Sequence, residues 1–146
     1  MSLLKNNIIF HCDTVQAIGK VKIDVNEMNM DTLTMSGHKI NAPKGIGVLY
    51  VRKTIPFTPL IFGHQERNRR GGTENVPYII GLGQAVELIL DDNYKSNIKL
   101  QQLRDYMENE IKRNINDIII YGDLENRLPN TSSIAFKGVK ADQLLL

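Results

Sequence analysis

Ser36, His38 and Lys39 lie close together at the end of residues 32–35, a short run that favours β-structure. Gly37 can adopt backbone angles closed to other residues, so the chain can turn there and aim its neighbours at one point. A hydroxyl and an imidazole can bind a phosphate, and a lysine amine can bond covalently to an aldehyde. Pyridoxal phosphate carries both groups, so this cluster predicts a pyridoxal phosphate site. The alternative is an ordinary loop with a solvated lysine.

A carboxylate lies at the end of an earlier apolar run. Residues 8–13 read as a buried strand that ends on Asp13, and Gln16 follows in the next turn. An aspartate beside the ring nitrogen of pyridoxal phosphate keeps that nitrogen protonated, as an electron sink requires. The alternative is that Asp13 caps the next helical turn. If this strand and the strand before Lys39 are parallel neighbours, both side chains reach the sheet edge where open α/β sheets bind ligands.

Four runs of residues, in the same order, resemble the cysteine desulfurase family of the NifS and IscS type. These proteins are class V aminotransferase-like enzymes of fold-type I. The resemblance covers about residues 8–146. Its four runs are HCDTVQAIGK at 11–20, SGHK at 36–39, PKGIGVLYVR at 43–52 and QERNRRGGTEN at 65–75.

The resemblance implies an α/β fold in two parts. Residues 1–92 would be the C-terminal part of the large cofactor domain, with a mostly parallel sheet and helices. Residues 93–146 would be a linking helix and the beginning of a truncated small α+β domain. The chain also begins and ends abruptly on apolar segments, so we expect it to be a fragment of a longer protein.

Roles for five residues follow from the resemblance. Lys39 would be the catalytic residue, which bonds to the cofactor and then moves protons on the substrate. Asp13 would pair with the ring nitrogen, and Gln16 would hydrogen-bond the phenolic oxygen. Ser36 and His38 would hold the phosphate.

Thr73 lies in a long polar loop, residues 63–75, and loops of this length are usually functional or mobile. The resemblance implies that Thr73 reaches the cofactor phosphate of a neighbouring subunit, so it also implies a homodimer. The basic cluster at residues 67–70 reads by itself as a solvated loop. The resemblance implies instead that this cluster lies near the cofactor phosphate bound by the partner subunit.

The implied activity converts L-cysteine to L-alanine and leaves an enzyme persulfide. The persulfide would supply a sulfur acceptor or an iron–sulfur scaffold protein, for iron–sulfur cluster or thio-cofactor assembly. Members of the family use a cysteine downstream of the matching region as the nucleophile, and no residue here aligns with it. We predict Cys12 to be a buried, unreactive residue. The isolated chain is therefore expected to lack desulfurase activity.

Two other classes of protein remain open. A selenocysteine lyase or an aminotransferase of the class V group would share Lys39, Asp13 and Gln16. The other possibility is a segment without catalytic function that serves in folding or dimerisation. Its buried strands would then need to pair with strands from the rest of the protein.

The composition of the 146 residues is that of an ordinary globular protein, with 42% hydrophobic and 23% charged residues. A net charge of +2, from 18 basic and 16 acidic residues, gives no support for nucleic acid or membrane binding. The single cysteine, Cys12, fits a reducing compartment, and we expect a cytoplasmic protein. Three histidines and one cysteine at these spacings predict no metal site.

The remaining elements follow from periodicity and from turn residues. We expect a helix from residues 76–77 to about 90, a break between residues 91 and 97, and then an amphipathic helix. Its buried stripe would consist of Leu103, Met107, Ile111 and Ile115. His11 shares a strand face with Asp13 and is a candidate partner for it. The expected strands are residues 46–51, which would be buried, 118–121 and 132–136, with weaker extended segments at 21–25 and 57–62, and a helix start at 139–142.

Overall fold

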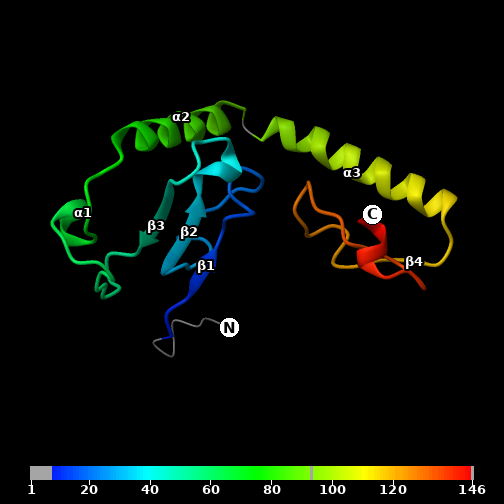
Figure 1. Cartoon of the computed structure of the whole chain (residues 1–146), viewed down its shortest axis with the longest axis horizontal. Coiled ribbons are helices and arrows are strands. Elements are labelled where there is room, and N and C mark those ends of the chain that lie inside the picture. The colour runs from blue at the N-terminus through cyan, green and yellow to red at the C-terminus, as the bar shows by residue number, and fades with distance from the viewer. Residues whose placement is uncertain (1–7, 93, 146) are drawn as a thin grey trace. The chain divides into compact units, whose positions relative to one another are not determined.

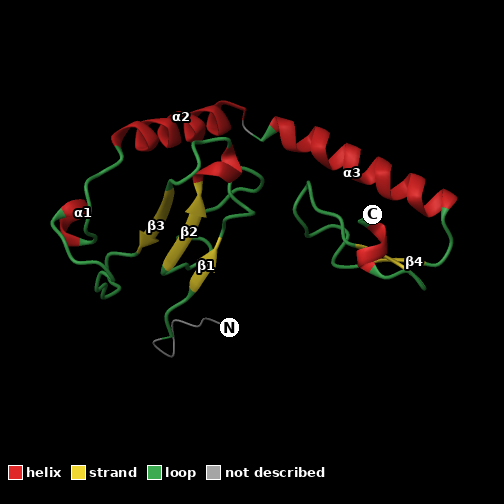
Figure 2. Cartoon of the chain, in the orientation of Figure 1, coloured by secondary structure: helices red, strands yellow, loops and turns green. Residues whose placement is uncertain are grey.

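The computed structural model describes residues 8–92 and 94–145. The chain divides into two compact units, one of residues 1–93 and one of residues 94–146. The expected break at residues 91–97 includes residue 93, which lies outside the described residues. Figure 2 shows strands and helices in both units, in agreement with the α/β class expected from the sequence.

The first unit contains a three-stranded sheet in the order β1-β2-β3, with β1 at His11–Asp13, β2 at Thr32–Ser36 and β3 at Gly47–Val51. β1 and β2 run parallel, and Asp13 lies opposite Thr34, so the predicted parallel pairing is confirmed. β3 runs antiparallel to β2, so the described sheet is mixed.

Helix α2, Val76–Asp92, begins at the predicted valine and proline. It packs against a short 3-10 helix, Gly37–Ile40, that follows β2. Ile40 and Ala42 form a buried cluster with Leu82 and Ala85 of α2. This cluster fixes the backbone on either side of Lys39 without burying Lys39 itself.

Several predicted strands are shorter or more exposed than expected. Residues 8 and 9 lie outside β1 and are exposed, and Cys12 is half-buried rather than buried. No strand forms at residues 21–25 or 57–62. β3 forms as predicted, but Leu49 is 49% exposed. β1 and β3 are the outer strands of the described sheet, so their apolar side chains lack a neighbour on one side.

A buried carboxylate anchors the ends of β1 and β2 that lie away from Lys39. Asp31 Oδ2 accepts a hydrogen bond from the Phe10 backbone N–H at 2.9 Å, and Asp31 Oδ1 lies 3.6 Å from Arg52 Nε. The Arg52 guanidinium also donates to the backbone carbonyls of Met30 and Val25. These bonds hold the loop before β2 against the end of β3.

We expect Asp31→Ala to destabilise the first unit by about 1–3 kcal/mol, because it leaves a backbone N–H without its acceptor and removes the partner of Arg52. The control is Glu27→Ala, which breaks the exposed 3.7 Å pair of Lys22 and Glu27 and should cost roughly 0–1 kcal/mol. Urea unfolding measures both. Equal midpoints for the two variants would contradict the anchoring role of Asp31.

The second unit consists of helix α3, Lys95–Asn114, and an antiparallel strand pair, β4 at Ile118–Ile120 and β5 at Ile134–Phe136. A 3-10 helix, Ala141–Leu144, follows β5 at the predicted helix start. The two strands confirm the sequence prediction within one or two residues at each end.

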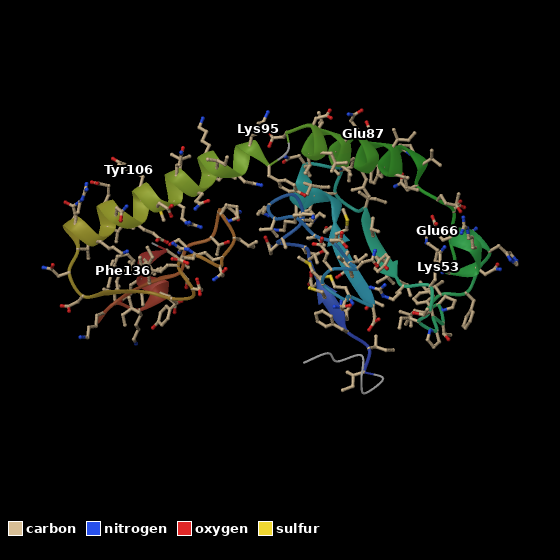
Figure 3. The ribbon with its side chains drawn as sticks, turned by 180° about the vertical axis from the view of Figure 1, so that it is seen from behind. Lys53, Glu66, Glu87, Lys95, Tyr106 and Phe136 are labelled. Carbon is tan, nitrogen blue, oxygen red and sulfur yellow. The ribbon has the colours of Figure 1, made fainter. Side chains whose placement is uncertain are left out.

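The predicted buried stripe of α3 is wrong. Leu103 and Met107 are 55% and 43% exposed, and Ile115 lies beyond the end of the helix. The buried residues of α3 are instead polar, namely Asn97, Arg104 and Glu108. Figure 3 shows Tyr106 on the side of α3 away from Phe136 of β5. This polar face of α3 can be buried because groups in the loop between β4 and β5 form hydrogen bonds with its charged side chains.

Glu108 is the centre of that polar contact. Its carboxylate accepts hydrogen bonds from Arg127 Nη1 and Nη2 at 2.7 and 2.8 Å, and from Ser132 Oγ at 2.6 Å. Arg104 Nη1 donates to the Leu128 backbone carbonyl at 2.9 Å. Two buried charges of α3 thus hold the loop between β4 and β5.

Candidate functional site

The turn after β2 carries three of the predicted site residues. Ser36 ends the strand, and Ser36 Oγ lies 2.7 Å from His38 Nδ1, a hydrogen-bond distance. Lys39 is exposed on the 3-10 helix between these residues and buried Ile40. A hydroxyl, an imidazole and an accessible amine therefore lie together at one end of the sheet.

Gly37 is required in this turn for a reason that differs from the prediction. It does not adopt the left-handed backbone region, whereas Asn41, which ends the 3-10 helix, does so with φ 63°. A Cβ at Gly37 would lie 2.8 Å from Ile46 Cγ2 and 3.1 Å from Ala42 Cβ. Close packing, rather than backbone freedom, therefore excludes larger residues at position 37.

Asp13 lies at the end of β1, the parallel neighbour of β2. Its Oδ1 accepts the Val15 backbone N–H at 2.9 Å, so the capping role considered from the sequence is present. Thr14, which is buried, donates both its N–H and its hydroxyl to the Thr34 carbonyl at 2.9 and 2.8 Å. These bonds fix the end of β1 against β2 and bring Asp13 to the same sheet edge as Ser36. Gln16 is exposed on the turn that follows.

His11 does not contact Asp13 as proposed from the sequence. Its Nδ1 lies 2.8 Å from Thr32 Oγ1, at hydrogen-bond distance. Although the period of a strand places His11 and Asp13 on one face, the parallel register brings Thr32 directly opposite His11. The Thr32 hydroxyl is therefore the hydrogen-bond partner of the His11 imidazole.

Lys20 is a second amine beside Gln16, and no role for it was predicted from the sequence. Its Nζ donates to the Gln16 backbone carbonyl at 2.8 Å. Burial lowers the pKa of Lys20, and the positive charge of Lys39 lowers it further. Its position in the run at residues 11–20, close behind Asp13 and Gln16, was the available signal.

Thr73 lies in the segment between α1, Gln65–Asn68, and α2. It lines a cavity of about 760 Å³ together with β3 and with Arg67, Arg69 and Arg70, whereas Lys39 and Ser36 do not line it. Within the loop, Gln65–Asn68 forms a single turn, α1, that the sequence did not predict and in which Glu66 and Arg67 have left-handed backbone angles. The lining includes Gly47, which lies opposite Ser36 in the sheet.

Among residues 8–92 and 94–145, no three His, Cys, Asp or Glu side chains come together as a metal site would require. In the same part of the chain, none of the helices has the length and apolar character needed to span a bilayer.

Comparisons with known proteins agree with one another. The family model for Aminotransferase class-V matches residues 2–146. The chain is 50% identical over 139 residues to a cysteine desulfurase of Nostoc sp., and 47% identical over 140 residues to the cysteine desulfurase NifS of Azotobacter vinelandii. These alignments cover 94% and 95% of this chain but 35% of each relative, so the chain spans about a third of their length.

A solved structure of a NifS-like protein from Rickettsia africae superposes on this chain with a TM-score of 0.88 at 34% sequence identity. The superposition covers 96% of this chain and 39% of that protein. The similarity therefore extends over both compact units.

Proposed function

Because this chain belongs to the aminotransferase class-V family, we propose that it is part of a pyridoxal phosphate-dependent cysteine desulfurase. The whole protein converts L-cysteine to L-alanine and leaves a persulfide on an enzyme cysteine. In this proposal the first unit is the later part of the large cofactor domain. The second unit is the linking helix and the beginning of the small domain.

The donor set at the sheet edge fits the cofactor. Lys39 offers an exposed amine for an aldehyde, and Ser36 and His38 offer a hydroxyl and an imidazole for a phosphate. The contact with Ser36 uses Nδ1 of His38, which leaves Nε2 as the second ring nitrogen for a ligand. Asp13 supplies a carboxylate from the neighbouring parallel strand. The single observation that carries the proposal is that Asp13 ends β1, while Lys39 lies on the 3-10 helix that directly follows β2, the parallel neighbour of β1.

Each residue then has a defined task. The bound cofactor stabilises negative charge on the substrate's α-carbon. Asp13 holds a proton at the ring nitrogen, and Gln16 orients the phenolic oxygen. Ser36 and His38 bind the phosphate. Lys39 would hold the cofactor at its aldehyde carbon, and its amine would move a proton at the substrate's α-carbon.

The cavity that holds Thr73 supports a proposed homodimer. Thr73, which is exposed, and three arginines line a cavity to which Lys39 of the same chain does not contribute. Cationic side chains beside a hydroxyl favour an anion. In the proposal, Thr73 reaches the phosphate bound by the partner subunit. The persulfide passes its sulfur to an acceptor or iron–sulfur scaffold protein in the cytoplasm.

The expected result for the protein at the full length of its relatives is release of alanine from L-cysteine, measured by chromatography. The 146-residue chain alone should release none, because no residue in it aligns with the nucleophilic cysteine. If the full-length protein releases alanine only from L-selenocysteine, it is a selenocysteine lyase. If it transfers an amino group instead, it is an aminotransferase. Either result would contradict this proposal. A full-length protein that binds no pyridoxal phosphate would favour a structural role.

A further inference from the structure

Thr14 lies between the end of β1 and the turn that carries Gln16, and it is 2% exposed. Its backbone N–H and its hydroxyl both donate to the Thr34 carbonyl, at 2.9 and 2.8 Å. Its own carbonyl accepts the backbone N–H groups of Ala17 and Ile18, both at 2.9 Å. Every polar group of Thr14 is therefore used, and together they tie this residue to β2 and to the turn.

The two residues proposed to contact the cofactor ring lie on either side of this junction. Asp13 precedes Thr14 and lies opposite Thr34 in the parallel register. Gln16 follows Thr14 in the turn, and Lys39 lies on the 3-10 helix that follows the strand of Thr34. The bonds between Thr14 and Thr34 therefore set how both ring contacts lie relative to the segment that carries the amine.

The Asp13 carboxylate is held by one of its two oxygens. Its Oδ1 accepts the Val15 backbone N–H at 2.9 Å. Among residues 8–92 and 94–145, no group donates a hydrogen bond to Oδ2, and the side chain is exposed. Oδ2 is thus available to a ring nitrogen, in an orientation that depends on the backbone of residues 13–15 and hence on Thr14.

We propose that Thr14 is a positioning residue, whose buried hydroxyl holds the Asp13 carboxylate where it pairs with the protonated ring nitrogen of pyridoxal phosphate. This inference rests on the proposed function, because the proposed function assigns that contact to Asp13. A contact discriminates between ligands only when the groups behind it hold it in one geometry, and a buried, hydrogen-bonded hydroxyl provides such support. Thr14 acts here through Asp13 and does not itself touch the cofactor.

The test uses a cofactor analogue in which a C–H group replaces the ring nitrogen. The 146-residue chain is titrated with pyridoxal phosphate or with this deaza analogue, reduced with borohydride, and analysed by mass spectrometry for the adduct at Lys39. Asp13 favours only the ligand that has the ring nitrogen, so the ratio of the two apparent affinities reports the position of its carboxylate. Asp13→Asn, which removes the negative charge, gives the ratio expected when this contact is lost.

Thr14→Val keeps the shape of the side chain and removes its hydroxyl. We expect it to lower the ratio by about fivefold, the equilibrium effect of one neutral hydrogen bond, through a weaker affinity for pyridoxal phosphate alone. Thr14→Ser keeps a hydroxyl and should keep the wild-type ratio. The matched control is Thr32→Val, which removes a hydroxyl between the same two strands, the 2.8 Å contact with His11, at the end of β1 away from Lys39. The control should also keep the wild-type ratio.

A second measurement needs no ligand. The bond to Asp13 Oδ1 protects the Val15 amide from hydrogen exchange, which is measured by nuclear magnetic resonance. If Thr14 holds this turn, Thr14→Val should raise the exchange rate of the Val15 amide several-fold. Thr32→Val should leave that rate unchanged.

The outcomes separate this inference from the proposed function. A ratio that Asp13→Asn lowers and Thr14→Val does not would overturn the role of Thr14 and leave the proposed function intact. Equal changes in Thr14→Val and Thr32→Val, or an unchanged exchange rate of the Val15 amide in Thr14→Val, would do the same. A Thr14→Ser chain with a lowered ratio would also overturn the inference, even if Thr14→Val does not fold. Absence of an adduct at Lys39 in the wild-type chain would overturn both proposals.

Discussion

Replacement of Lys39 by alanine is expected to abolish the borohydride-stable attachment of pyridoxal phosphate to this chain. The loss should be complete rather than partial, because the bond forms to the amine that the substitution removes. Among residues 8–92 and 94–145, no other lysine has a neighbouring hydroxyl and imidazole arranged like Ser36 and His38 at the end of β2. Mass spectrometry of the reduced chain measures the effect.

The matched control is Lys44→Ala. Lys44 is also exposed and lies in the loop that follows the 3-10 helix, so it reports attachment to any accessible amine of this region. We expect the control to retain the wild-type level of attachment. Attachment spread over several lysines, and unchanged in Lys39→Ala, would show that position 39 carries an ordinary surface lysine.

The relation of Asp13 to Lys39 could be predicted because it depends on local patterns. An apolar run that ends on a carboxylate, and a second run that ends on a turn with a lysine, are both visible in the sequence. Parallel pairing then brings the two strand ends to one edge. The packing role of Gly37 could not be predicted, because it depends on Ile46, which the antiparallel return of the chain into β3 brings against position 37.

Apolar periodicity was less reliable, and α3 shows the reason. The pattern correctly indicates that Leu103 and Met107 share a face of a helix, but it does not say what covers that face. The face that packs within the second unit carries Arg104 and Glu108, which sequence rules assign to solvent. Glu108 is paired with Arg127 and Ser132, and Arg104 with the Leu128 carbonyl, all some twenty residues away, and no local pattern reports such partners.

The charged cluster at Glu108 therefore leads to the largest expected effect on stability. The side chains of Glu108 and Arg127 are 5% and 13% exposed and form two hydrogen bonds. Arg127→Met keeps most of the side-chain volume but leaves the Glu108 carboxylate buried without its cation. Because removal of one partner of a buried ion pair strands the other charge, we expect a loss of about 3–5 kcal/mol.

Arg113→Met is the control, since the Arg113–Glu110 pair has the same 2.7 Å distance but side chains that are 74% and 37% exposed. Its loss should be roughly 0–1 kcal/mol. Amide hydrogen exchange of β4 and β5 measures the second unit directly. If both variants exchange at the same rates, burial does not govern the strength of the Glu108–Arg127 pair.

The pH dependence gives the same pair a second test. Hydrogen bonds from Arg127 lower the pKa of Glu108 from its ordinary value of 4.5 to about 2. The folded unit therefore holds fewer protons than the unfolded chain between these values, so the stabilisation is complete above pH 4.5 and is lost as the pH falls towards 2. Arg127→Met removes the cause of the shift, and the stability difference between wild type and variant should shrink over this range. A difference that stays constant from pH 6 to pH 2 would mean that the variant acts through lost packing and not through the stranded carboxylate.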